Sequence, residues 1–509
     1  MYLLYLLSFE KITFSIPINQ MKKLISIVVL TFLISYTFSS CKDKEIITPD
    51  PVVPDQIFTI APDSLKFEEA GGNSTLTVTM NGNGWSVLSD QTWCTVSFNT
   101  SSKASDQIVV TTIPNTIASK RTASLTFIMD YKKVIVFKVI QSPKTGLYES
   151  YKDSIAPNAS GMGSTAVEIA KNIKLGLNIG NTLEATGGET GWGNPMITNE
   201  LIKTVKQNGF NAVRLPCAWD QYADQATAKI STTWLSRVKQ VVQYCVDNDL
   251  YVILNIHWDG GWLENNCTVD KQVANNAKQK AFWEQIATTM RDFDEHVLFA
   301  SANEPNVADA TQMGVLLSYH QTFIDAVRST GGKNAYRVLV VQGPSTDIET
   351  TNKLMNQMPT DKVPNKMMAE VHYYTPWNFT GMTKDETWGN MAYYWGANYH
   401  SVSDAAHNST WGEEATVDAN FGLMKQQFVD KGIPVIIGEF GAIRRDDLTG
   451  EALKLHLASR AYYFKYVTKQ AIAKGLMPFF WDTGGLIDRS KNTVLDQQSL
   501  DALKQGAGE

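Results

Sequence analysis

The sequence has few cysteines, no cluster of basic residues and none of the histidine patterns that bind metals. Its 509 residues include 5 cysteines and carry a formal net charge of −6, and 19% of them are charged. Without a basic cluster there is no electrostatic footprint for a nucleic acid, so no such partner is expected. Neither His-x-His nor His-Glu-x-x-His occurs, and no metal or other cofactor is expected.

Four of the cysteines are irregularly spaced, in a pattern that matches neither a zinc site nor a disulfide framework. We expect them to be buried free thiols, which is the usual state of isolated cysteines in a globular domain. They are Cys94, Cys217, Cys245 and Cys267.

The N-terminus has the pattern of a targeting segment. A charged start at residues 21–23 precedes an apolar run over residues 24–38, and two serines lead to Cys41. This order resembles a bacterial lipoprotein signal spanning residues 1–41, with cleavage before Cys41 and lipid attachment to its sulfur. A chance cysteine, or a longer membrane-inserted segment that includes residues 1–20, stays open as an alternative. We expect a secreted lipoprotein of the outer membrane, exposed at the cell surface.

The rest of the chain divides into two domains, as its length suggests. Residues 42–55 are charged and proline-containing, which is typical of a linker. Residues 56–143 show short alternating strands, and Asn-Gly turn signals occur at residues 81–84, so they predict a small all-β sandwich of immunoglobulin-like architecture. Residues 144–164 contain prolines and glycines and predict a second linker. A second, larger domain is expected over residues 165–509.

Three short motifs characterise the sandwich segment: Trp85-Ser86-Val87, Trp93-Cys94-Thr95-Val96 and Val139-Ile140-Gln141. They resemble the BACON domain, a family named for suspected carbohydrate binding. Isolated tryptophans within strand-patterned runs usually pack inward. We therefore expect Trp85 and Trp93 in the core and a spacer role for the domain.

From residue 165 onward, apolar strands alternate with amphipathic helices such as those expected at 232–247, 274–293 and 453–474. Eight such units predict an α/β fold, a closed (β/α)8 TIM barrel. An open doubly wound sheet is the alternative, but no glycine-rich phosphate loop follows the first strand. The predicted strands lie near residues 174–180, 210–215, 250–256, 297–303, 337–342, 367–372, 434–439 and 477–481.

Two glutamates follow apolar strands at the barrel end where catalytic residues gather. Residues 297–302 run into Asn303-Glu304-Pro305, and residues 435–438 lead to Glu439. On strands four and seven, the two carboxylates can approach to about 5 Å, the separation of a retaining double displacement. Repulsion and burial should raise the pKa of one carboxyl group, so that this group arrives protonated and can protonate the leaving oxygen while the other stays ionised. Two structural glutamates paired with arginines are the alternative.

Further polar and aromatic residues end other strands at the same rim. Arg214 on strand two could keep a nucleophilic carboxylate ionised. His257 and His372 end strands three and six, and a packing role is the alternative for a single histidine at such a place. Trp481 on strand eight is expected to form a floor for a sugar ring, although it could also plug the barrel.

These residues belong to motifs that resemble glycoside hydrolase family 5 from about residue 169 to the end of the chain. By that resemblance Glu304 is the acid/base, Glu439 the nucleophile and Asn303 a donor to the sugar 2-hydroxyl. The motifs are Gly176-Leu177-Asn178-Ile179-Gly180-Asn181-Thr182-Leu183, Asn303-Glu304-Pro305, His372-Tyr373-Tyr374, Gly438-Glu439-Phe440-Gly441 and Trp481.

The resemblance also implies contacts around the reacting sugar. Arg214 and Tyr374 would contact the nucleophile, and Trp481 would stack beneath the ring. His257 and His372 would order the sugar and the acid/base. Asn178 in the first motif is likewise expected at the substrate.

The first motif and Trp192-Gly193-Asn194-Pro195 are similar to subfamily 4, whose members act on β-1,4-glucans such as cellulose, mixed-linkage glucan and xyloglucan. A retaining endo-β-1,4-glucanase is therefore expected, with a dedicated xyloglucanase as the alternative because a BACON-like domain precedes the barrel. Trp258 stands where many relatives have a second histidine, and a sugar contact is expected there. We expect a monomer whose partners are the β-glucan and, through its lipid, the membrane.

A long aromatic-rich loop is predicted between strand six and its helix, at about residues 375–414. Loops of this length are usually functional, and aromatics at a barrel mouth could line outer sugar subsites. Trp377 and Trp395 are the candidates for sugar contact, and about half of the aromatics should anchor the loop. The loop contains Trp377, Trp388, Tyr393, Tyr394, Trp395 and Trp411.

Two other functions would use the same residues differently. A metal-dependent hydrolase could use His257, His372 and a carboxylate as ligands, but the first strand ends without a ligand pair. A non-catalytic glycan-binding protein would be a barrel that has lost its chemistry, which the presence of both glutamates argues against.

Overall fold

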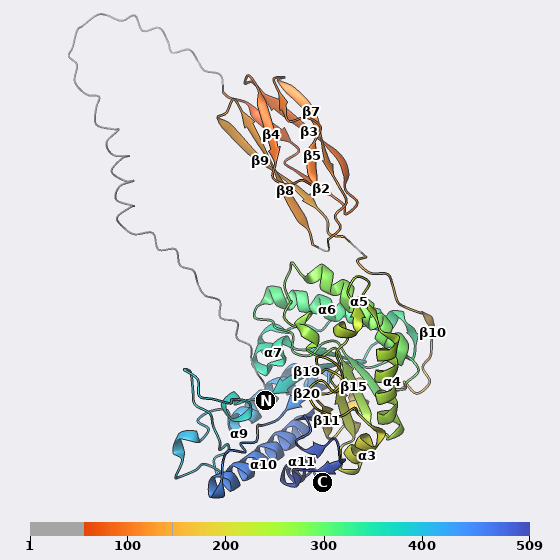
Figure 1. The fold of residues 1–509 in the computed structure, drawn as a ribbon, viewed down its shortest axis with the longest axis vertical. Helices are drawn as coiled ribbons and strands as arrows, with labels where there is room; N and C mark the ends of the chain where they lie inside the picture. Colours follow the sequence, from red (N-terminus) through yellow and green to blue (C-terminus); the bar gives the residue numbers. More distant parts are fainter. Residues whose placement is uncertain (1–54, 118, 145) are drawn as a thin grey trace, which may run out of the picture. The chain divides into compact units, whose positions relative to one another are not determined.

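The computed structural model describes residues 55–509 apart from residues 118 and 145. The expected signal segment, Cys41 and nearly all of the first linker lie outside the described residues. Within the described part, no helix has both the length and the apolar composition needed to cross a bilayer. The described chain forms an all-β domain and an α/β barrel (Figure 1).

The all-β domain is a sandwich of two sheets, as the alternating pattern predicted. One sheet has the strand order β1-β3-β7-β5 and the other β2-β9-β8-β4-β6. Trp85 and Trp93 are buried in the shared core, which confirms that they are packing residues. The strands are β1 (Phe58–Ala61), β2 (Ser64–Phe67), β3 (Gly72–Met80), β4 (Trp85–Ser89), β5 (Cys94–Val96), β6 (Thr100–Ser101), β7 (Ser105–Thr112), β8 (Arg121–Met129) and β9 (Lys133–Gln141).

Eight parallel strands close into a barrel in chain order, because the first pairs with both the second and the last. This confirms the (β/α)8 prediction and excludes the open sheet, and each strand overlaps one of the predicted ranges. The strands are β11 (Gly176–Ile179), β12 (Ala212–Leu215), β15 (Tyr251–Asn255), β16 (Val297–Ala300), β18 (Leu339–Gln342), β19 (Met367–Tyr373), β20 (Val435–Phe440) and β21 (Leu476–Asp482).

Helices surround the barrel (Figure 1), and apolar side chains of these helices are buried in its core. In α4, for example, Trp234, Val238, Val241 and Cys245 recur at helical spacing and are all buried. The helices are α2 (Ala166–Asn172), α3 (Asn199–Gln207), α4 (Thr232–Asp247), α5 (Gln272–Met290), α6 (Ala310–Ser329), α7 (Ile348–Leu354), α8 (Trp377–Thr380), α9 (Glu414–Gln427), α10 (Gly450–Ala473) and α11 (Gln497–Ala507).

The barrel interior is apolar toward the amino ends of its strands. Ile253, Leu298, Val340 and Ile436, from four of the barrel strands, form one buried cluster, which α2 covers through Ile169. Polar side chains are therefore confined to the carboxyl ends, where the catalytic residues of such barrels lie. The four described cysteines are buried free thiols, as predicted.

Part of the second expected linker, residues 144–164, makes hydrogen bonds to the barrel. Ser150 Oγ and the backbone N–H of Tyr151 donate to the buried carboxylate of Glu284, at 2.9 and 2.6 Å. Strand β10 (Ile155–Pro157) then pairs with β17 (Gly331–Gly332). Residues 150–157 are therefore held against the barrel at these points.

Candidate active site

Glu439 lies near the end of β20, where the strand departs from regular pairing. The register with β19 shifts so that Val371 pairs with Ile437 and His372 with Glu439, which leaves Gly438 as an extra residue. A bulge of this kind turns the side chain that follows it. Glycine is required there, since a Cβ on Gly438 would lie 2.1 Å from a carboxylate oxygen of Glu370.

Arg214 on β12 is completely buried and connects four polar side chains. Its Nη1 donates to Glu439 Oε1 at 2.8 Å and to Asn178 Oδ1 at 3.0 Å. Its Nη2 donates to Asn303 Oδ1 at 2.9 Å, and its Nε lies 2.9 Å from Glu370 Oε1. A buried cation is tolerated only with such partners. Arg214 therefore orients Glu439 through a buried contact, and none of its surface is exposed to substrate.

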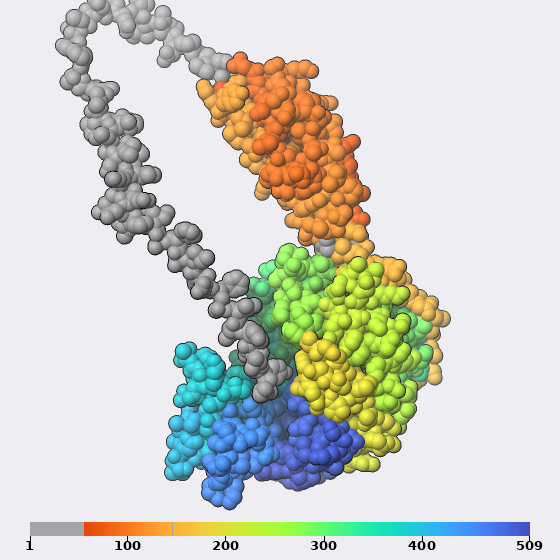
Figure 2. Space-filling view, in the orientation of Figure 1, coloured from red at the N-terminus to blue at the C-terminus, as the bar shows by residue number. Residues whose placement is uncertain are grey.

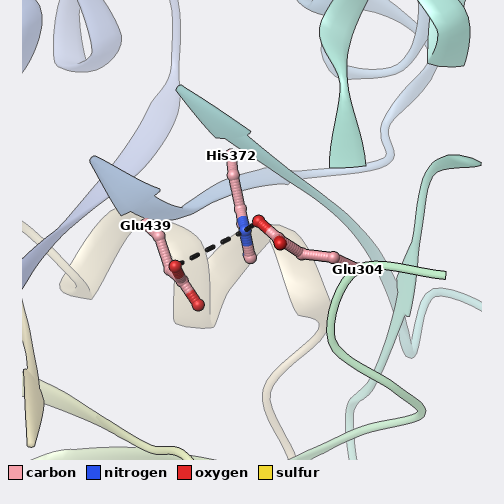
Figure 3. A group of neighbouring side chains, drawn as sticks. All are labelled: Glu304, His372 and Glu439. Atoms are coloured by element: carbon pink, nitrogen blue, oxygen red, sulfur yellow. Dashed lines mark hydrogen bonds and ion pairs between the residues drawn. The ribbon is translucent and has the colours of Figure 1, made fainter. Parts of the chain in front are cut away.

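Glu304 follows β16 by four residues and meets Glu439 across His372 (Figure 3). Glu304 Oε1 lies 2.7 Å from His372 Nδ1, which lies 3.8 Å from Glu439 Oε2. Tyr374 donates its hydroxyl to Glu439 Oε2 at 3.0 Å. Atoms of the two carboxylates and the imidazole all lie within 4.8 Å of one another. This spacing fits the separation of about 5 Å in retaining glycosidases and is too short for the inverting arrangement.

The two glutamates differ in their access to solvent. The side chain of Glu304 is 39% exposed and that of Glu439 only 7%. Both oxygens of Glu439 accept hydrogen bonds, one from Arg214 and one from Tyr374. An accessible carboxyl can reach a glycosidic oxygen, and a buried carboxylate held by two donors presents its oxygen in a fixed direction.

His372 carries the mobile proton of the site. Burial opposes its charge, but the carboxylates of Glu439, Glu304 and Glu370 raise the pKa of His372 to about 10. The imidazole is therefore protonated at neutral pH and donates from Nδ1 to Glu304. The contact between this imidazole and Glu304 suits proton transfer.

The pKa directions correct one expectation. For Glu304, burial favours the neutral acid, but the hydrogen bond and charge of His372 lower the pKa below its usual value. For Glu439, burial raises the pKa against the charges of His372 and Arg214. The resemblance gave Glu304 the acid role, and with it the raised pKa, because the imidazolium partner of this carboxyl could not be foreseen. His372 can pass a proton to Glu304 along their hydrogen bond.

His257 and Trp481 form a flat wall beside these carboxylates. Their rings are stacked, with centroids 5.8 Å apart and planes 9° apart. Burial and the charges of Arg214 and His372 hold the pKa of His257 well below its usual range, so the ring is neutral. Trp258 follows on the loop and is exposed. An aromatic surface next to an acid pair suits the apolar face of a pyranose ring.

Asn178 does not reach the substrate, which corrects the expectation. The side chain is completely buried on β11, its Nδ2 donates to the Gly438 carbonyl at 2.8 Å, and its Oδ1 accepts from Arg214. Although β21 lies between β11 and β20 in the closed barrel, this hydrogen bond joins them, so Asn178 braces the strand that bears the nucleophile. It positions the site without touching sugar.

Trp395 is the second wrong prediction of a sugar contact. It is 0% exposed, its Nε1 donates to the Gly412 carbonyl at 2.9 Å, and its ring packs 5.0 Å from that of Tyr463 on α10. It anchors the long loop to the barrel, because both its apolar face and its N–H are satisfied internally. Trp377 is half exposed and lies edge-to-face with Tyr374, so it stays available to substrate.

Two site residues escaped the sequence analysis. Glu370 contacts both Arg214 and, at 3.2 Å, His372 Nε2. Its signal was the alternation in Glu370-Val371-His372, which puts two polar side chains on one face of β19. Glu264 accepts from the backbone N–H of Glu304 at 3.2 Å. Burial and the charge of Glu304 raise its pKa to about 7, and no motif around this loop residue indicated it.

Comparison with protein families gives two matches. The family model described as cellulase (glycosyl hydrolase family 5) matches residues 178–486, which include Glu304 and Glu439. A model described as the viral BACON domain matches residues 58–138, within the sandwich.

Individual relatives match more of the chain. A xyloglucan-specific endo-beta-1,4-glucanase from Bacteroides ovatus is 35% identical over 466 residues, covering 87% of this chain and 90% of the relative. The solved structure of a Bacteroides ovatus GH5 xyloglucanase with a XXXG heptasaccharide has a TM-score of 0.66 and 33% identity, and covers 89% of this chain and 100% of that one. A broad-specificity GH5-4 endoglucanase from Bacteroides salanitronis has a TM-score of 0.61 and 33% identity, covering 70% and 99%. The chain belongs to glycosyl hydrolase family 5.

Proposed function

We propose that this enzyme is a retaining endo-β-1,4-glucanase of plant cell-wall β-glucans. The observation that carries the proposal is the placement of Glu304 and Glu439 within 4.8 Å around one protonated histidine. The relatives named as glucanases and xyloglucanases supply the substrate class. No cofactor is needed, because each step below is a proton transfer or a carboxylate displacement.

In the first step Glu439 attacks the anomeric carbon of the sugar. A bond forms between this carbon and a Glu439 oxygen while the bond to the leaving oxygen breaks. The proton passes from His372 to Glu304 along their 2.7 Å contact and from Glu304 to that oxygen, which leaves Glu304 ionised and His372 neutral. Before the attack Arg214 holds Glu439 Oε1 and Tyr374 holds Glu439 Oε2, so the carboxylate is already oriented.

In the second step water replaces the enzyme on the sugar. Glu304, now ionised, takes a proton from a water molecule as that water attacks the anomeric carbon, and the bond to Glu439 breaks. The glutamate leaves as a carboxylate, which is favoured by the adjacent Arg214. Two inversions give a product of unchanged β configuration.

A dedicated xyloglucanase is the second candidate, favoured by a relative that spans both domains and is named xyloglucan-specific. The deciding experiment is a product profile on xyloglucan, barley β-glucan, carboxymethylcellulose and mannan. We expect internal cleavage of xyloglucan and β-glucan, with xyloglucan cleaved fastest. Cleavage of xyloglucan alone would favour the dedicated enzyme, and cleavage of mannan alone would contradict the proposal.

The charge on His372 predicts the pH profile of a His372→Asn variant. In the wild type the proton shared with Glu304 is lost only as the pH rises toward the His372 pKa of about 10. In the variant this proton resides on Glu304 alone, so the alkaline limb of kcat/KM should move to lower pH. Profiles of the wild type and of His407→Asn, a control histidine in the long loop, should coincide. An unmoved alkaline limb in His372→Asn would contradict the assigned role.

We also propose that the protein is anchored through Cys41 in the outer membrane and faces the cell surface. The support is the order of charged, apolar and small residues before Cys41. In cells, Cys41→Ala should lose labelled fatty acid and leave the membrane fraction, whereas Ser40→Ala keeps a small residue and should behave as the wild type. Protease added to intact cells should degrade the wild type; full protection would place it inside.

A further inference from the structure

A second cavity lies within the long loop between β19 and α9, apart from the catalytic glutamates. It has a volume of about 550 Å³ and is lined by residues from both halves of the loop, among them Trp388, Asn390, Thr410 and Trp411. Figure 2 shows this segment, coloured cyan to light blue, projecting from the side of the barrel. A cavity of this size accommodates a sugar residue.

The two tryptophans of the cavity are unusually exposed. Trp388 is 61% exposed and Trp411 is 47% exposed, whereas Trp395 in the same loop is completely buried. Large exposed aromatics concentrated at a concave site indicate a ligand with apolar faces. The apolar face of a pyranose ring is such a surface, and its hydroxyl groups require polar partners at the rim.

Polar groups with free hydrogen-bonding capacity accompany the tryptophans. Within the described chain, the side chains of Asn390 and Thr410 take part in no hydrogen bond. Asn378, another lining residue, is 7% exposed, and its Oδ1 has no partner among the described residues. A buried amide oxygen is normally satisfied, so an unpaired one at a cavity wall indicates a hydroxyl or water that completes it.

The loop holds both tryptophans on a fixed frame. Trp388 lies in a tight turn closed by mutual hydrogen bonds between Glu386 and Gly389, at 3.0 and 3.1 Å. The carbonyl of Trp411 accepts from Ser409 Oγ at 2.8 Å. Preformed sites of this kind bind with a small loss of entropy.

We infer that this cavity binds a single pyranose unit of the β-glucan, outside the subsites that flank the cleaved bond. The inference rests on the proposed function for its ligand class. A connection to the catalytic site runs through Trp377, which contacts Tyr374 on one side and precedes the lining residue Asn378 on the other. The bound unit is either a backbone glucose or a branching xylose, which share the same chemistry.

The test measures oligosaccharide binding to the full chain that carries Glu439→Ala, so that no substrate is consumed. This parent variant is compared with double variants that also carry Trp388→Ala, Trp411→Ala or Thr410→Val. Each protein is titrated calorimetrically with cellohexaose and with a xyloglucan oligosaccharide. Loss of affinity by about tenfold for the tryptophan variants, and by a smaller factor for Thr410→Val, is expected. If affinity falls for both ligands, the cavity binds a backbone glucose. If affinity falls for the branched ligand alone, the cavity binds a xylose.

Val402 provides the matched control, since it is fully exposed in the same loop and does not line the cavity. Val402→Ala should bind as the parent does, and all variants should melt at similar temperatures. Unchanged affinity in Trp388→Ala, Trp411→Ala and Thr410→Val would overturn the inference. Failure of the wild type to cleave any glucan would instead refute the proposed function, and the titration would still report on the cavity.

Discussion

Replacing Glu439 by alanine is expected to lower kcat on β-glucan by roughly 10⁴- to 10⁶-fold, because the covalent step loses its nucleophile. The fold should survive, since Arg214 keeps Glu370 as an ion-pair partner at 2.9 Å. Binding of an oligosaccharide should persist. The measurement is initial-rate release of reducing ends, with calorimetry for binding. Retained binding without turnover distinguishes an enzyme from a non-catalytic glycan-binding protein.

Azide gives the Glu439→Ala result a stereochemical test. The anion can occupy the space of the missing carboxylate and attack the anomeric carbon of an activated β-cellobioside from that face, which yields the α-glycosyl azide. Glu451→Ala, at the exposed start of α10, is the matched control and should retain full activity. Normal turnover in Glu439→Ala would refute the assignment of the nucleophile.

Replacing Glu304 by alanine should lower the rate on β-glucan by roughly 10²- to 10⁴-fold, because the leaving sugar oxygen loses its proton donor. The loss should depend on the leaving group. A dinitrophenyl β-cellobioside departs without protonation, so its first step should proceed, while the second step becomes slow for lack of a base. A burst of dinitrophenol followed by slow turnover is the expected time course.

Azide should rescue this second step in Glu304→Ala. Unlike water, azide needs no base, and it attacks the glycosyl-enzyme from the face that Glu304 had occupied, so the product is the β-glycosyl azide. The wild type, which still has its base, should form none. Formation of the α-azide, or equal losses on glucan and on the activated substrate, would show that the roles of the two glutamates are wrongly assigned.

The strongest sequence signals were charged or titratable residues at the ends of apolar strands. Glu304, Glu439, Arg214 and His372 were found in this way, because each barrel strand delivers its last polar residue to the same rim. The wrong predictions came from other signals, Trp395 from its place in a long loop and Asn178 from the first motif. Loop position says nothing about which aromatic turns inward, and a polar residue near a strand end can contact another strand instead of the substrate.

Sequence alone determined the order of the two domains, the eight strands of the barrel and the two glutamates, since hydrophobic periodicity and strand-end chemistry are local properties. Only the tertiary structure decided that His372 is the partner of Glu304 in proton transfer and which tryptophans are exposed. Those depend on distances between segments far apart in the chain: His372 reaches Glu304 across 68 positions, and the halves of one loop close around a cavity. Charge coupling falls steeply with separation, so ångström-scale placement by the fold sets the pKa directions of the two carboxyl groups.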